Sequence, residues 1–157
     1  DTTDVASLDN AFKKMHNMFG NLDILVVNAG ISKDPKRILD ADANNWWNHL
    51  EVNVRGIFNT IRAFMPFSRS EEIDGTTTSK ATILNISSGA NCLPAMEALQ
   101  AKSKIATAKM IEYLGSEVPG LRVVNVHPGA IASDMGTTED RGFCMMTVCL
   151  IPSSGCA

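Results

Sequence analysis

Apolar residues recur along this chain with two different periods, and each change of period marks the boundary of an expected element. Over residues 8–19 they follow the 3.6-residue spacing of a helix, with Gly20 as the stop. The same spacing predicts a long helix over residues 47–65, ended by Pro66, and a third helix over residues 96–114. Short apolar runs lie between the helical patterns.

These runs occupy residues 22–28, 81–87 and 121–126. Continuous apolar runs are typical of strands that are buried on both faces of a parallel sheet. Residues 29–43 and 68–79 are polar and are expected to be loops. The alternation of strands and helices predicts right-handed parallel crossovers with the 81–87 strand in the centre. We therefore expect an α/β fold, a partial Rossmann-type, doubly wound parallel sheet of three strands with flanking helices.

Residues 136–157 have no clear period, so we expect a folded domain over residues 1–135 and an irregular C-terminal tail over 136–157. The four cysteines form no CxxC pair, which favours unpaired thiols over a disulfide or metal site and indicates a cytoplasmic protein. The formal net charge is −3 and no basic patch occurs, which argues against a nucleic-acid partner. The longest late apolar run, 143–151, is too short to span a membrane, and no leader pattern opens the chain.

Polar residues stand at the ends of all three expected strands. The first strand ends in Asn28-Ala29-Gly30, the second in Ser87-Ser88 and the third in Pro128-Gly129. In parallel sheets ligands bind at the carboxyl ends of the strands, so we expect a site at this edge. Asn53 interrupts the apolar face of the long helix, and a buried amide there needs hydrogen-bond partners. Taken alone, most of these residues have structural explanations, such as a turn for Asn28; taken jointly they favour a functional site.

In this order and at this spacing the elements resemble the short-chain dehydrogenase/reductase family. Asn28-Ala29-Gly30 is similar to the family's NNAG element, with Val27 in place of the first asparagine, and Asn53 is similar to its helical asparagine. The segment 85–88 resembles the strand end that carries the active-site serine, and 128–135 resembles the PG motif beside the nicotinamide. The opening Asp1-Thr-Thr-Asp resembles the segment that meets the adenine ring.

The resemblance implies an oxidoreductase that uses NAD or NADP to interconvert a small-molecule carbonyl and an alcohol. It assigns catalytic roles to Asn53, Ser88 and Lys104, where the serine binds the substrate oxygen and the lysine binds the nicotinamide ribose. The implied cofactor-binding residues are Asp1, Asn28, Ala29, Gly30, Lys104, Pro128, Gly129, Ile131 and Ser133.

Two parts of the family pattern are missing. The tyrosine of YxxxK would stand at position 100 if Lys104 is its lysine, but the residue is Gln100, and the only tyrosine is Tyr113. No glycine-rich phosphate-binding turn occurs in the chain. We therefore expect the chain as written to be inactive, even with a tyrosine restored at position 100. The alternative is a non-catalytic, degenerate homologue that acts as a binding or interaction module.

In the family the strand before Asn28 lies beside the first strand of the fold, which this chain lacks. Residues 24–27 would then form an apolar edge with unpaired backbone groups. Such edges pair with other chains, so we expect self-association.

Overall fold

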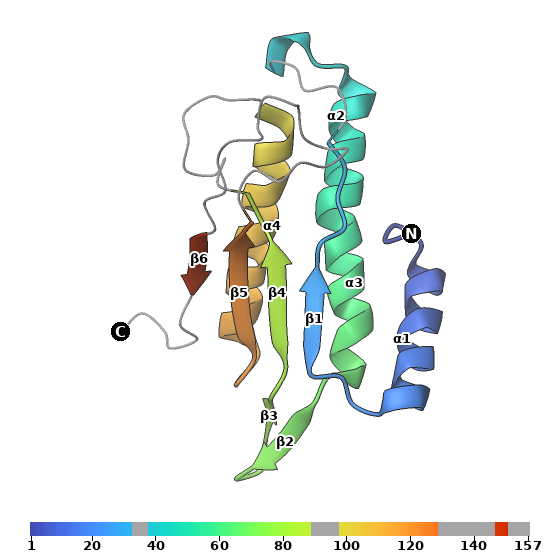
Figure 1. Ribbon diagram of the computed structural model, residues 1–157, viewed down its shortest axis with the longest axis vertical. Helices are drawn as coiled ribbons and strands as arrows, with labels where there is room; N and C mark the ends of the chain where they lie inside the picture. Colours follow the sequence, from blue (N-terminus) through green and yellow to red (C-terminus); the bar gives the residue numbers. More distant parts are fainter. Residues whose placement is uncertain (33–37, 89–97, 129–146, 151–157) are drawn as a thin grey trace.

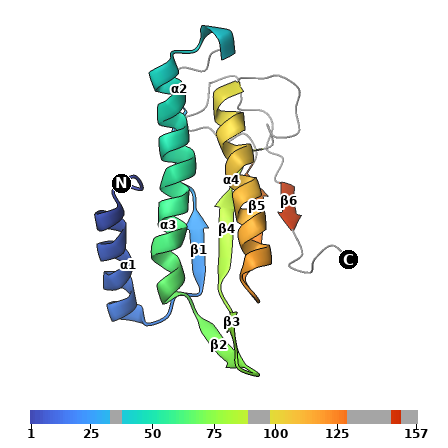
Figure 2. The same ribbon diagram turned by 180° about the vertical axis from the view of Figure 1, so that it is seen from behind.

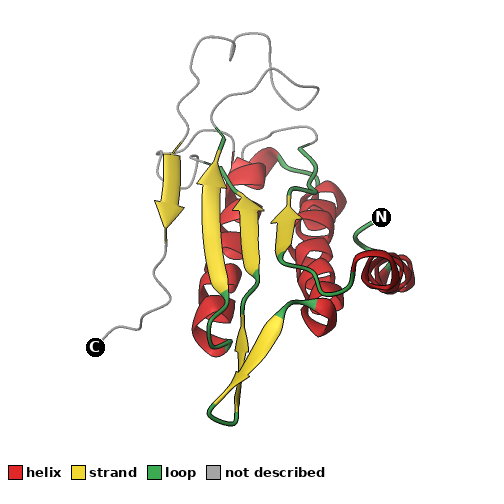
Figure 3. Ribbon diagram, turned by 60° about the horizontal axis from the view of Figure 1, so that its bottom comes forward, coloured by secondary structure: helices red, strands yellow, loops and turns green. Residues whose placement is uncertain are grey.

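The computed structural model describes residues 1–32, 38–88, 98–128 and 147–150. Within these residues the helices over 43–64 and 98–117 cover one face of a sheet, and the helix over 5–19 lies beside the first of them (Figures 1 and 2). Figure 3 shows the helices behind the strands, with nothing described on the opposite face of the sheet. The helices and strands thus form two layers.

The sheet has the order β1-β4-β5-β6, from β1 (Ile24–Val27) and β4 (Thr82–Ile86) to β5 (Arg122–His127) and β6 (Thr147–Leu150). β1, β4 and β5 are parallel, and Leu25, Ile83 and Val123 lie side by side across them. The expected parallel sheet with the 81–87 segment between the other two strands is confirmed. β6 pairs antiparallel with β5. It lies in the segment for which the hydrophobic pattern predicts no element.

The first helix, α1 (Val5–Phe19), packs on α3. The Asp4 carboxylate accepts a hydrogen bond from the backbone N–H of Ser7, so Asp4 is the N-cap. Gly20 ends the helix with a positive φ of 76°. Phe12 packs edge to face against Phe64, with ring centroids 6.0 Å apart. This pair anchors α1 to the rest of the layer.

A short turn, η1 (Ile38–Asp40), precedes the long helix, which consists of three consecutive parts and a closing turn. α2 (Ala43–Leu50) leads into a π-helical segment, η2 (Glu51–Arg55), which continues as α3 (Gly56–Phe64) and ends in the 3-10 turn η3 (Met65–Phe67). The predicted helix is confirmed, but it begins four residues earlier and widens into a π-helix around Asn53. Hydrophobic spacing does not detect one π-helical turn.

The prediction of a loop over residues 68–79 is wrong. β2 (Ser70–Ile73) and β3 (Thr76–Ser79) form an antiparallel hairpin that projects beyond the amino ends of β1 and β4 (Figure 1). Asp74 and Gly75 join the strands with φ values of 51° and 76°. Asp-Gly is a preferred pair for a two-residue hairpin turn with two positive φ values, and this signal outweighs the polar composition of the strands.

The last helix, α4 (Ala98–Glu117), covers β4 and β5 (Figure 2). It runs past Gly115, the residue at which the sequence predicts its end. A side chain at position 115 would place its Cβ 2.7 Å from Cγ2 of Val123. Gly115 therefore allows close packing of helix and sheet instead of ending the helix.

The apolar core lies between the sheet and the helices. Its fully buried members include Ile57, Phe64, Ile83, Ile111 and Leu121. The other face of β1 presents Ile24 and Val26, which are 62% and 54% exposed. Among the residues that the structure describes, no helix is long and apolar enough to cross a membrane.

Candidate functional site at the strand ends

Asn53 is fully buried and binds the segment that follows β1. Its Nδ2 donates to the backbone oxygen of Ile31 at 2.9 Å, and the backbone N–H of Ile31 donates to Asn53 Oδ1 at 2.7 Å. One carboxamide therefore satisfies both backbone groups of one residue. This pairing fixes the segment from Asn28 to Ile31, which carries the predicted cofactor-binding residues.

Lys104 enters the same region from α4. Its Nζ donates to the backbone oxygen of Ile86, near the end of β4, at 2.7 Å. The residue is only 6% exposed, and within the described parts of the chain no carboxylate lies within ion-pair distance of the ammonium. Burial lowers the pKa of Lys104 below its usual value of 10.5. Among the described residues, the site thus contains a desolvated cation with no carboxylate paired to it.

Gly30 lies between these two side chains. A side chain at this position would place its Cβ 3.2 Å from Asn53 Oδ1 and 3.7 Å from Lys104 Nζ. The first contact is tighter than ordinary packing, so glycine lets the backbone approach the amide. Gly30, Asn53 and Lys104 come from three separate elements, and the fold brings them together.

Two hydroxyl groups that the sequence analysis overlooks complete this cluster. Ser103 Oγ accepts a hydrogen bond from Asn53 Nδ2 at 3.0 Å, and Thr107 Oγ1 donates to the backbone oxygen of Asn53 at 3.1 Å. Both residues are fully buried. The available signal was their spacing, because residues four apart on a helix share a face and Ser103 directly precedes Lys104.

A second buried polar pair lies on the helix-facing side of the sheet. Asn85 Nδ2 donates to Asn125 Oδ1 at 2.7 Å across neighbouring strands. The remaining amide atoms, Asn85 Oδ1 and Asn125 Nδ2, are buried and have no hydrogen-bond partner among the described residues. This pair lies directly before Ile86, whose carbonyl binds Lys104.

Four of the other predicted residues follow the carboxyl ends of the strands, namely Asn28, Ala29, Ser88 and Pro128. Ser88 directly follows Ser87 at the end of β4 and is half-buried, and Pro128 follows β5. Asn28 and Ala29 are exposed at the end of β1. Asp1 is exposed, and its carboxylate accepts hydrogen bonds from the N–H and the hydroxyl of Thr3, both at 2.9 Å. Gly129, Ile131 and Ser133 lie outside the described residues, and so do the side chain of Gln100 and any contact that it makes.

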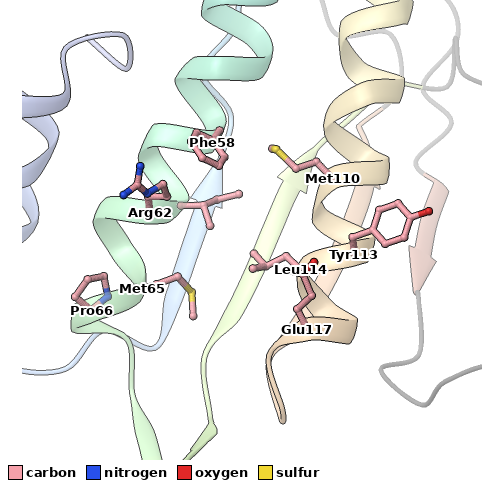
Figure 4. Close-up of a pocket in the computed structure, with 9 residues that line it drawn as sticks. Phe58, Arg62, Met65, Pro66, Met110, Tyr113, Leu114 and Glu117 are labelled. Carbon is pink, nitrogen blue, oxygen red and sulfur yellow. The ribbon is translucent and has the colours of Figure 1, made fainter.

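An apolar groove lies elsewhere, between α3 and α4. Figure 4 shows Phe58 and Met110 facing each other across it, with Arg62 on α3 and Tyr113 and Glu117 on α4. The groove has a volume of about 520 Å³ and an apolar lining. It extends toward Pro66, at the amino ends of the strands, and none of the predicted site residues lines it. Tyr113 is 61% exposed there, so it does not replace the tyrosine missing at position 100.

The donor groups at the strand ends suit a hydroxyl-rich ligand. An ammonium group has three N–H donors, and among the described residues Lys104 uses one of them, toward Ile86. The other donors are available for hydroxyl oxygens, and the adjacent backbone at Gly30 carries no side chain to block approach. The residues present therefore fit the ribose of a nicotinamide cofactor.

The comparisons with known proteins agree with one another. The sequence model described as short chain dehydrogenase matches residues 1–142. An uncharacterized oxidoreductase of Schizosaccharomyces pombe is 34% identical over 139 residues, which cover 86% of this chain and 51% of that protein. The chain spans about half the length of the relatives it matches.

Solved structures share the fold. The KRED1-Pglu enzyme has a TM-score of 0.75 at 26% identity, over 86% of this chain and 53% of that one. An alcohol dehydrogenase from Thermococcus sibiricus, complexed with 5-hydroxy-NADP, has a TM-score of 0.72 at 24% identity, over 87% of this chain and 55% of that one. The second likeness concerns the fold alone.

Proposed function

The chain belongs to the short-chain dehydrogenase family, and from this premise we propose that it carries the lysine–asparagine half of an NAD(P)-dependent oxidoreductase site with impaired proton transfer. Members of this family generally bind NAD(P) and act on small-molecule carbonyl or alcohol substrates. The impairment follows from Gln100, which stands four residues before Lys104 where the family has its tyrosine.

The observation that supports the proposal is the junction of Gly30, Asn53 and Lys104 at the carboxyl edge of the sheet. Lys104 would hold the ribose hydroxyls through its remaining N–H groups. Asn53 would keep the Gly30 backbone in place beneath the ligand. When bound, NAD(P) supplies the hydride for the redox step.

The remaining roles follow from the resemblance. Ser88 would donate a hydrogen bond to the substrate oxygen, where negative charge develops during reduction. Asp1, Asn28, Ala29, Pro128, Gly129, Ile131 and Ser133 would form further cofactor contacts. The proton has no protein donor at position 100, because a carboxamide does not ionise. The loss of a general acid lowers the rate by roughly 10²–10⁴.

A non-catalytic role is the second candidate, and Gln100 is the observation that favours it. Such a protein would keep the ligand-binding half of the site and use it for recognition. Only the oxidoreductase candidate allows turnover, and it would be slow. Both candidates bind nicotinamide cofactors, which separates them from a protein that does not.

Titration of the 157-residue chain with NADH and NADPH, followed by nicotinamide fluorescence, tests the proposal. We expect weak binding that falls at least about tenfold in Lys104→Met, the loss expected when a charged hydrogen-bond donor is removed. Cofactor oxidation with a panel of ketones and aldehydes should stay at background in the chain and in Gln100→Tyr, since no glycine-rich turn holds the pyrophosphate. Turnover on the order of 1 s⁻¹ in the unchanged chain would contradict the impaired site. Absence of any nicotinamide binding in a folded chain would contradict the cofactor assignment.

We also propose that the chain on its own self-associates through the β1 edge. The support is that β1 pairs only with β4 among the described strands, while Ile24 and Val26 are exposed on the uncovered sheet face. Sedimentation at tens of micromolar should give species larger than a monomer, and Val26→Lys should reduce them. A monodisperse monomer for the unchanged chain would contradict this.

A further inference from the structure

Two hydroxyl side chains on one face of α4 both bind Asn53. Ser103 Oγ is bonded to the side-chain amide of Asn53, and Thr107 Oγ1 to its backbone oxygen, at 3.0 and 3.1 Å. α4 therefore fixes this residue at two points, one on the side chain and one on the main chain. All three residues are fully buried. No water competes for these bonds at such a position, so each bond is stronger than an exposed one.

The residue they hold lies in an unusual part of the helix. Asn53 is the central residue of the π-helical segment η2 (Glu51–Arg55). Such turns are rare, occur as single turns within α-helices and need support from their surroundings. Thr107 provides a donor from a neighbouring helix directly to the main chain of this turn. The supported turn aims the Asn53 carboxamide at both backbone groups of Ile31.

We propose that Ser103 and Thr107 are positioning residues that hold Asn53, and through it the Gly30–Ile31 backbone, against Lys104. The inference rests on the proposed function, because the backbone so fixed is the one that would lie beneath the cofactor. Hydrogen bonds connect α4 to Asn53 and Asn53 to the loop after β1. In this loop Gly30 lies beside Nζ of Lys104, which belongs to α4 itself. A change at Thr107 is thereby transmitted to a loop to which it makes no hydrogen bond among the described residues.

The half-buried Thr60 offers a control for the local part of the bonding that Thr107 makes. Thr107 Oγ1 is also 2.8 Å from the oxygen of Ser103, four residues earlier, so its single proton is shared between two carbonyls. Thr60 Oγ1 makes the same kind of bond, 2.8 Å to the oxygen of Gly56, four residues earlier, and it makes no hydrogen bond to another element among the described residues. Thr60→Val therefore removes the local bond alone, whereas Thr107→Val removes the local bond together with the interhelical one.

Hydrogen exchange of the Ile31 amide in the free chain measures the coupling, because this N–H donates to Asn53 Oδ1. The reference is the Thr82 amide, which donates to Asp23 O in the sheet at 2.8 Å. In Thr107→Val we expect the Ile31 rate, relative to Thr82, to rise roughly tenfold, as for the loss of one buried hydrogen bond. Thr107→Ser, which keeps the hydroxyl, should restore the parent ratio, and Thr60→Val should leave it unchanged.

Equal acceleration of Ile31 and Thr82 would show a loss of global stability only and would overturn the proposal, as would an unchanged ratio. Ser103→Ala removes the other hydroxyl without added bulk, and it should raise the same ratio if Thr107→Val fails to fold. NADH and NADPH titration of the same variants separates the two hypotheses. A raised ratio in a chain that binds no nicotinamide overturns the proposed function and leaves the coupling standing. An unchanged ratio in a chain that binds nicotinamide overturns the coupling and leaves the proposed function standing.

Discussion

The layer between helices and sheet has two halves made from the same elements. Toward the amino ends of the strands it is apolar, with Ile57 and Phe64 from α3 and Ile111 from α4. Toward the carboxyl ends it is polar and equally buried. Its residues there are His49, Asn53, Asn85, Ser103, Lys104, Thr107 and Asn125.

The change from one half to the other takes a single step along β4 and along β5. On β4 it falls between Ile83 and Asn85, and on β5 between Val123 and Asn125, two residues apart on the same face. Apolar packing stabilises without direction, whereas buried amides and hydroxyls stabilise only in one geometry. The comparison indicates that the apolar half provides most of the stability and the polar half fixes the arrangement of the site.

The largest effect is expected in the apolar half. Phe64→Ala removes a fully buried ring that packs against Phe12, and the free energy of unfolding should fall by about 3–5 kcal/mol. Urea denaturation followed by circular dichroism measures the loss. Phe19→Ala is the control, since Phe19 is 73% exposed, and it should change the free energy by less than about 0.5 kcal/mol. Similar losses in both variants would mean that the apolar half is not the stabilising one.

In the polar half Asn53→Leu keeps the shape of the side chain and removes its hydrogen bonds. The backbone groups of Ile31 lose their partners, so we expect a loss of about 2–3 kcal/mol in urea denaturation. Asn59→Leu serves as the control, because Asn59 is also buried but has one long bond, 3.4 Å to the oxygen of Thr2. Equal losses would argue that burial of the amide matters more than its contacts.

The pair Asn85 and Asn125 sharpens the comparison, because within the described parts of the chain one hydrogen bond accompanies two buried amide atoms without a partner. Replacing both residues with leucine removes the unpaired atoms together with the bond, so the double variant should stay within about 1 kcal/mol of the parent. Each single variant breaks the bond and leaves the other amide buried, at a loss of about 1–3 kcal/mol. A thermodynamic cycle from urea denaturation measures the coupling. A double variant as unstable as the sum of the single variants would contradict this account.

The smallest effect concerns pH. The pKa of Lys104 is lowered by burial, so between that lowered value and 10.5 the unfolded chain binds more protons than the folded chain. The free energy of unfolding therefore gains a contribution that rises with pH through this window and is absent at lower pH. Denaturation of the parent and of Lys104→Met across the alkaline range isolates the contribution as a difference. A difference that falls as the pH rises would contradict a burial-driven shift.

The apolar half and the strand order could be predicted from the sequence, because hydrophobic periodicity records which residues face the core. Asn53 and Lys104 could be placed at the site only through their resemblance to family motifs. Ser103 and Thr107 could not, since serine and threonine are common on helices and their partner lies fifty residues away in the chain. The π-helical turn escaped prediction for a related reason, since its one-residue shift leaves the apolar face of the helix nearly intact.

The β2–β3 hairpin shows a different limit. Its strands are polar and short, and hydrophobic periodicity gives no signal for them; the informative residues were Asp74 and Gly75 in the turn. Here local turn chemistry decides the structure where the hydrophobic pattern does not.

The π-helical segment η2 also has a consequence for insertions and deletions in related sequences. A π-turn holds one residue more than the α-helical turn that would replace it, so it is equivalent to a single-residue insertion. Substitution at Asn53 can remove the amide, but it leaves the extra residue in place. Deletion of one residue between 51 and 55 would return this turn to α-helical geometry and leave the faces of α2 and α3 in their present relation. Relatives that have lost the site through deletion would then differ from this chain by a one-residue gap at η2, with the apolar faces on either side still aligned.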